Sequence, residues 1–119
     1  MKILLVDDER KFAMMLARRL ALRGFQAKFV HSGADAIDMV KTGECFDVAV
    51  LDVKMPGIGG IELRRKLQHL DPDMKFIFLT GHGSNIDYSV GAKEAALYLP
   101  KPLNIDDLLN ALSKVAGSS

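Results

Sequence analysis

Short apolar runs alternate with longer stretches of mixed polarity along the whole chain. The runs are rich in Val, Ile, Leu and Phe, and several stop at an acidic or hydroxyl residue. Such runs are typical of strands that are buried on both faces of a sheet. We predict strands over residues 2–6, 26–30, 47–51, 75–79 and 97–99.

The stretches between these runs show apolar residues every three or four positions, which predicts amphipathic helices. Gly24 and Gly43 are placed to end the first two helices. Ser32 and Asn104 are candidate N-caps for the second and the last helix. A third helix is predicted over residues 60–70, where Asp71-Pro72 follows and ends it.

The helix expected over residues 86–96 has the weakest pattern. Its apolar face is thin, and it contains Gly91, which costs about 1 kcal/mol in a helix interior relative to alanine. We expect it to be the most mobile element. Strand and helix nevertheless alternate five times, which predicts an α/β domain with a parallel sheet and helices on both faces.

Composition narrows the class of protein. The 119 residues suit a single domain over 1–119, with 116–119 as a tail or the start of a linker. A net charge of +1 gives no support to direct nucleic-acid contact. Cys45 is the single cysteine, and no apolar run reaches the length of a membrane span. The first apolar run is too short for a signal peptide, so we expect a cytoplasmic protein.

Chemically active residues follow four of the five predicted strands. Asp7 and Asp8 follow the first, Asp52 the third, Thr80 the fourth, and Lys101 comes just after the fifth. The carboxyl ends of parallel strands share one edge of the sheet, where ligands bind in open α/β folds. If the first, third, fourth and fifth strands are neighbours, these five residues meet there.

Three carboxylates at one edge repel each other when they are ionised, and a divalent cation offsets this electrostatic repulsion. Oxygen ligands with room for water suit Mg²⁺. We predict Asp8 and Asp52 as direct ligands, together with a backbone carbonyl of the following loop, that of Lys54. Asp7 is expected to hold a metal-bound water.

A carboxylate in this setting can act as a nucleophile toward phosphorus and form an acyl phosphate. The cation and the Lys101 ammonium would neutralise the charge that develops on the phosphoryl oxygens. The product adds about two negative charges, which the nearby Thr80 hydroxyl can turn to meet. Asp52 is therefore the predicted phosphoryl acceptor.

Each of these residues also has a simpler interpretation. Asp7 or Asp8 can be a helix cap, Thr80 can merely end a strand, Lys101 can be a solvated loop charge, and Tyr98 can be a core aromatic. An aspartate-based phosphatase would want a second acid two residues after the nucleophile, but Lys54 stands there. A binding module that is never phosphorylated is the third possibility, and Asp8, Asp52 and Lys101 together argue against it.

Four motifs in this order resemble the receiver domain of bacterial two-component response regulators over nearly the whole chain. They are Ile3-Leu4-Leu5-Val6-Asp7-Asp8-Glu9, Leu51-Asp52-Val53-Lys54-Met55-Pro56 with Gly60, Phe78-Leu79-Thr80-Gly81, and Tyr98-Leu99-Pro100-Lys101-Pro102-Leu103. The resemblance implies a flavodoxin-like (βα)5 fold with strand order 2-1-3-4-5. It also implies a cis bond between Lys101 and Pro102.

The same resemblance implies a function. A sensor histidine kinase, or a phosphotransfer protein, would pass a phosphoryl group to Asp52 in the presence of Mg²⁺, and the receiver itself would catalyse that step. Thr80 and Tyr98 would be the switch pair, while Lys54 and His82 are candidates to modulate the lifetime of the phosphate. By the same resemblance, the domain is expected to be a signalling switch rather than an enzyme acting on other substrates.

The output remains open at this stage. The domain is expected to control a transcriptional output domain, or to form a dimer through helix 4, strand 5 and helix 5. The alternative is a standalone regulator that acts by protein contact or as a phosphorelay intermediate. Neither alternative involves a membrane.

Overall fold

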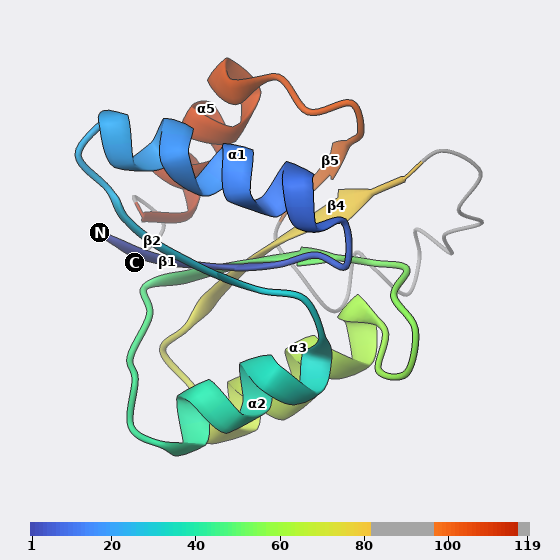
Figure 1. Ribbon diagram of the computed structural model, residues 1–119. Coiled ribbons are helices and arrows are strands. Elements are labelled where there is room, and N and C mark those ends of the chain that lie inside the picture. Colours follow the sequence, from blue (N-terminus) through green and yellow to red (C-terminus); the bar gives the residue numbers. More distant parts are fainter. Residues whose placement is uncertain (82–96, 117–119) are drawn as a thin grey trace.

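Strands and helices alternate in a computed structural model of the chain, which describes residues 1–81 and 97–116 (Figure 1). The strands are β1 (Lys2–Val6), β2 (Gln26–Val30), β3 (Val48–Asp52), β4 (Lys75–Thr80) and β5 (Leu97–Pro100). The helices are α1 (Arg10–Leu22), α2 (Gly33–Lys41), α3 (Gly60–Leu70) and α5 (Ile105–Ala116). The helix predicted over 86–96 lies outside the described residues.

The strands form one parallel sheet in the order β2-β1-β3-β4-β5. The predicted fold class is therefore confirmed. Because β1 lies between β2 and β3, its carboxyl end is next to that of β3: Val6 pairs with Leu51. On the other side of β3, Asp52 pairs with Leu79 of β4. The order thus brings three of the chemically active strand ends side by side.

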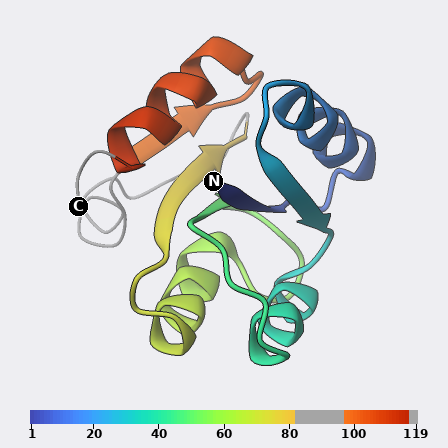
Figure 2. The same ribbon diagram turned by 90° about the vertical axis from the view of Figure 1, so that its left-hand side faces the viewer.

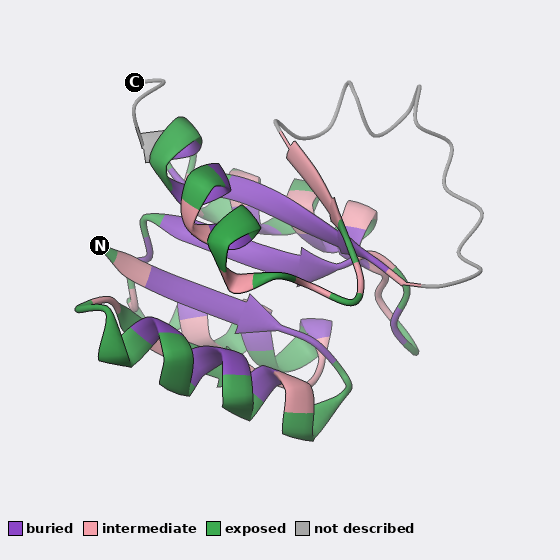
Figure 3. Ribbon diagram, turned by 90° about the horizontal axis from the view of Figure 1, so that it is seen from above, coloured by how far each residue is buried: buried purple, intermediate pink, exposed green. Residues whose placement is uncertain are grey.

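Two apolar cores lie on opposite faces of the sheet. Successive β1 residues alternate between them, because side chains of a strand point to alternate faces: Ile3 and Leu5 contact the α1 and α5 side, and Leu4 and Val6 the α2 and α3 side. Figures 1 and 2 show these two helix pairs on either side of the sheet. The sheet centre is buried on both faces (Figure 3), as the uninterrupted apolar run predicts.

Two strand boundaries differ from the sequence prediction in ways that matter for the site. β3 begins and ends one residue later than predicted, so Asp52 is its last paired residue. Asp47 instead accepts the backbone N–H of Lys2 on its carboxylate at 2.7 Å, just before the strand. β4 extends to Thr80, which pairs with Pro100 of β5. Both Asp52 and Thr80 are therefore fixed by sheet pairing.

The predicted helix signals hold in the structure. The Ser32 hydroxyl accepts the backbone N–H of Asp35 at 3.2 Å, and the Asn104 side-chain carbonyl accepts that of Asp106 at 2.8 Å. The cis bond between Lys101 and Pro102 is also present. Across the described part of the chain, the helices lack the length and apolar character needed to cross a bilayer.

Candidate functional site

Three aspartates form a cluster at the carboxyl edge of the sheet. Asp7 and Asp8 directly follow β1, and Asp52 ends β3. One carboxylate oxygen from each lies within 4.8 Å of the other two. Asp7 and Asp52 are buried, with 2% and 4% of their surface exposed, while Asp8 is exposed. The three acids, which come from the ends of two strands, thus meet at one edge, where Asp8 is exposed to solvent.

The loop after Asp52 is fixed by backbone contacts. The Val53 N–H donates to the Leu79 carbonyl at 2.9 Å, and the Val53 carbonyl accepts the N–H of Gly60 at 2.9 Å. Gly60 begins α3 so close to the strand end that a Cβ there would collide with the carbonyl oxygen of Asp52. Gly57 has φ +76°, which favours glycine and lets the loop turn back toward α3. The backbone around Asp52 is therefore held from both sides.

Lys101 lies among the acids, as predicted. Its Nζ is 2.8 Å from Asp7 Oδ2, 2.8 Å from Glu9 Oε1 and 3.7 Å from Asp52 Oδ2. Only 12% of the lysine side chain is exposed. The loop after β5 therefore delivers an ammonium to the mouth of the cluster, and the lysine is not a solvated loop charge.

Two neighbours of Lys101 were missed by sequence reasoning. Glu9 pairs with the ammonium, although the sequence presents it only as the third acid of Asp7-Asp8-Glu9. The Phe12 ring centroid lies 4.8 Å from Nζ, a cation–π contact. The helical periodicity assigns Phe12 to the core, and Phe12 also packs against the apolar core on the α1 and α5 side of the sheet. The run of three acids could have indicated that Glu9 lies near the site, whereas nothing in the sequence around Phe12 indicates its contact with Lys101.

The proposed switch residues lie on neighbouring strands. Thr80 is 8% exposed, and its hydroxyl donates a long hydrogen bond of 3.5 Å to the Leu99 carbonyl. Its own carbonyl accepts the backbone N–H of Lys101 at 2.8 Å. The half-buried Tyr98 ring packs against Phe78, with centroids 5.1 Å apart. Thr80 thus links the acid edge to β5, and its hydroxyl points toward β5 in this state.

Two other predicted positions have different outcomes. The Lys54 side chain is exposed in the loop that follows Asp52. A metal-ligand role for its carbonyl stays a prediction. His82 lies outside the described residues.

Burial and mutual repulsion govern the charge states of the cluster. Burial, followed by the Asp7 charge, raises the pKa of Asp52 to about 7. Burial also raises the pKa of Asp7, against the opposing effect of Lys101. For Lys101, burial lowers the pKa, but its contacts with Asp7 and Glu9 outweigh burial and leave it above the usual value. Asp7 and Asp52 therefore tend to keep a proton unless a cation neutralises their charge.

The donor set fits Mg²⁺, because carboxylate oxygens with an open side leave room for the waters that this ion keeps. Both oxygens of Asp7 already have partners, since Oδ1 accepts the backbone N–H of Glu9 at 2.9 Å and Oδ2 pairs with Lys101. Asp8 and Asp52 are therefore freer to bind a metal directly. The division of roles, with Asp8 and Asp52 as direct ligands and Asp7 holding a metal-bound water, stays a prediction.

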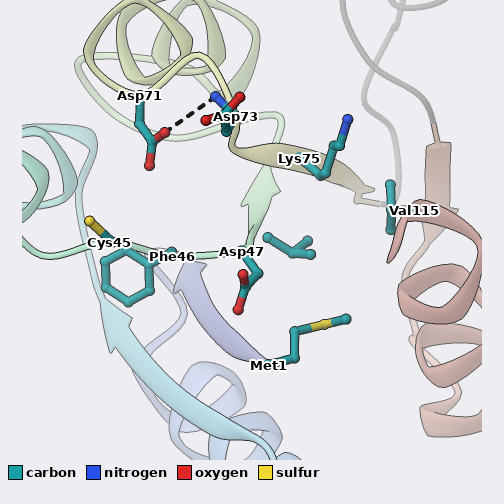
Figure 4. Close-up of a pocket in the computed structure, with 9 residues that line it drawn as sticks. Met1, Cys45, Phe46, Asp47, Asp71, Asp73, Lys75 and Val115 are labelled. Carbon is teal, nitrogen blue, oxygen red and sulfur yellow. Dashed lines mark hydrogen bonds between the residues drawn. The ribbon is translucent and has the colours of Figure 1, made fainter. Parts of the chain in front are cut away.

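Two pockets lie at opposite edges of the sheet, and only one of them adjoins the acid cluster. One of about 460 Å³ adjoins Lys101 and is lined by Glu9, Phe12, Met15, Gly81, Lys101, Pro102 and Leu103. A larger one, about 770 Å³, lies at the opposite edge, where β1, β3 and β4 begin. Figure 4 shows Asp47, Asp71, Asp73 and Lys75 around that second pocket. None of the predicted site residues lines it, so pocket size does not indicate where the chemistry lies.

Known proteins share this fold. Residues 3–113 match the family model of the response regulator receiver domain. The chain belongs to this family. Response regulator MprA of Mycobacterium avium is 36% identical over 92% of the chain and 48% of the relative, and that of Mycobacterium bovis is 36% identical over 91% and 47%. The chain thus spans about half the length of these curated relatives.

Solved structures agree with the family assignment. A CheY-like receiver domain protein from Methanospirillum hungatei superposes with a TM-score of 0.88 at 29% identity, covering 98% of this chain and 94% of that one. Response regulator TrrA of Thermotoga maritima, in complex with Mg²⁺-BeF, gives 0.83 at 30% identity, covering 96% and 97%. That relative binds magnesium and a fluoride of beryllium.

Proposed function

We propose that this domain accepts a phosphoryl group on Asp52 from the phosphohistidine of a sensor histidine kinase or phosphotransfer protein. The observation that carries the proposal is the Lys101 ammonium, 3.7 Å from Asp52 and 2.8 Å from Asp7 at the mouth of the acid cluster. A buried carboxylate beside a cation and further acids is the arrangement that phosphoryl transfer to an aspartate requires.

In this step an Asp52 oxygen attacks phosphorus and forms the O–P bond, while the P–N bond to the donor imidazole breaks. The bonding electron pair returns to the imidazole nitrogen. Asp52 must be ionised to attack, and the pKa of about 7 places that requirement within the physiological range. Lys101 neutralises charge on the phosphoryl oxygens. Mg²⁺, when bound by Asp8 and Asp52, supplies further neutralisation and lowers the cost of ionising Asp52.

The product changes the end of β4 and β5. The new phosphoryl oxygens are strong acceptors, and the weak 3.5 Å hydrogen bond from Thr80 to Leu99 is easily exchanged for one to them. Tyr98 lies in the neighbouring strand, two residues before the partner of Thr80 in the sheet. Thr80 and Tyr98 then act as the switch pair, and Lys54 and His82 modulate how long the phosphate lasts.

The domain serves as a signalling switch, not as an enzyme with a substrate of its own, and it acts in the cytoplasm. The curated relatives are about twice as long as this chain. An attached output domain, transcriptional in kind, is the output we favour. A standalone regulator or a phosphorelay intermediate is the alternative.

Phosphate incorporation tests the proposal. Incubated with phosphoramidate and Mg²⁺, the wild-type chain should gain the mass of one phosphoryl group, and Asp52→Asn should gain none. Asp73→Asn is the matched control, because this exposed carboxylate lies at the opposite edge of the sheet. Incorporation into Asp52→Asn, or none into the wild type, would contradict the proposal.

A further inference from the structure

The Glu9 carboxylate is one of the two groups nearest to the Lys101 ammonium. Its Oε1 lies 2.8 Å from Nζ, whereas Asp52 Oδ2 lies 3.7 Å away. The lysine side chain is 12% exposed and that of Glu9 is 64% exposed, so Glu9 meets the ammonium from the solvent side. In this state Lys101 is closer to Glu9 than to the acceptor.

Glu9 occupies a position at which a side chain usually caps the helix with a hydrogen bond. It is the N-cap residue of α1, yet it makes no side-chain capping hydrogen bond. Ser, Thr, Asp and Asn are the residues that stabilise this position. The equivalent position of α2 is Ser32, which does cap its helix. A residue type that departs from the usual N-cap preference is expected where the side chain serves a function elsewhere.

The Glu9 backbone is held in place independently of its carboxylate. Its N–H donates to Asp7 Oδ1 at 2.9 Å, while the other Asp7 oxygen pairs with Lys101. Asp7 therefore connects the Glu9 backbone and the lysine, and the Glu9 side chain can leave the ammonium without disturbing the start of α1.

We propose that Glu9 is a positioning residue that competes with the phosphoryl group on Asp52 for Lys101. This inference rests on the proposed function. A phosphoryl group adds about two negative charges beside the ammonium, while an ion pair with a solvent-exposed partner is weak and easily given up. Glu9 thus holds Lys101 in the unmodified domain and lowers the affinity of the site for a phosphoryl-like anion.

Beryllofluoride, a phosphoryl mimic, measures this competition at equilibrium. Titrated at saturating Mg²⁺, Glu9→Gln should bind it about fivefold more tightly than the wild type. Glu62→Gln, which removes an exposed carboxylate from the first turn of α3, should bind with wild-type affinity. Wild-type affinity in Glu9→Gln, or weaker binding, would overturn the inference.

A second background separates competition for Lys101 from the general effect of one negative charge fewer. In Lys101→Ala, the added change Glu9→Gln should alter beryllofluoride affinity by less than about 1.5-fold. A gain of about fivefold in that background would show that Glu9 acts without the lysine, and would overturn the inference.

A third variant separates positioning from a structural role. Glu9→Ser supplies a favoured N-cap while removing the carboxylate, so it should bind beryllofluoride more tightly without lowering the melting temperature. A clear fall in melting temperature would show that Glu9 supports the fold. If the wild type itself binds no beryllofluoride with Mg²⁺, the proposed function fails and this inference fails with it.

Discussion

At the residue scale, Asp52 combines two properties that oppose each other. It is buried beside other acids, which disfavours its charge, and the proposed attack on phosphorus requires that charge. The 3.7 Å approach of Lys101 relieves only part of the conflict, because the ammonium is closer to Asp7 and Glu9. The unmodified, metal-free site is therefore under electrostatic strain that a cation relieves.

This strain predicts a pH-dependent stability. The pKa of Asp52 is about 7 in the folded chain and about 4 when unfolded. The folded state therefore binds more protons between these values, and its stability without Mg²⁺ should fall as pH rises from about 4 through about 7. At pH 8, Asp52→Asn should be more stable than the wild type by about 1–3 kcal/mol, and near pH 4 the difference should be small.

Urea unfolding at a series of pH values, in the presence of a chelator, measures this difference. Asp73→Asn supplies the control for removing one exposed carboxylate. A wild-type minus Asp52→Asn difference that stays constant from pH 4 to pH 8 would contradict the assigned pKa.

At the scale of elements, the join between β3 and α3 decides where Asp52 points. The helix starts against the strand end, with the Gly60 N–H on the Val53 carbonyl at 2.9 Å and no room for a Cβ beside the Asp52 carbonyl. The acceptor backbone is thus held by a contact that depends on the absence of a side chain.

Gly60→Ala should therefore destabilise the domain, although alanine is the better helix former. We expect a loss of about 1–3 kcal/mol, because the new Cβ meets backbone that cannot rotate away. Gly81→Ala is the control, since a Cβ there has open space and φ is not positive. Chemical unfolding measures both variants, and equal stability of Gly60→Ala and the wild type would refute the close contact.

At the scale of the whole molecule, the site is a meeting of distant segments. Asp7 and Lys101 are far apart along the chain, and their ion pair joins the end of β1 to the loop after β5 across the sheet edge. A ligand that binds the folded acid cluster but not the unfolded chain must stabilise the domain as a unit.

Magnesium should accordingly raise the melting temperature in a pH-dependent way. At about one hundred times its dissociation constant, Mg²⁺ should add about 2.7 kcal/mol, with a smaller effect below pH 7, where protons compete for Asp52. Asp8→Asn should lose most of this gain, and Asp73→Asn should keep it. A thermal scan with and without Mg²⁺ decides between these outcomes, and an equal gain in Asp8→Asn would contradict the assigned ligands.

Much of the molecule follows from local patterns. The uninterrupted apolar runs and the apolar residues at helical spacing predict the nine described elements. The predicted strands differ by one residue at the start of β3 and at the C-terminal ends Asp52, Thr80 and Pro100. Sheet pairing, which involves a neighbouring strand, sets those ends. Ser32 and Asn104 act within a few residues of themselves, and so they were predictable.

The polar residues that follow the strands, and hence the kind of chemistry, were determined by the sequence alone. Only the tertiary structure decided that Glu9 and Phe12 contact Lys101, and how deeply Asp52 is buried beside the other acids. The physical reason is the distance along the chain between the groups that interact. Helix and strand patterns reflect forces between near neighbours in the chain, whereas the charge state of Asp52 depends on burial and on groups that only the packed fold brings together.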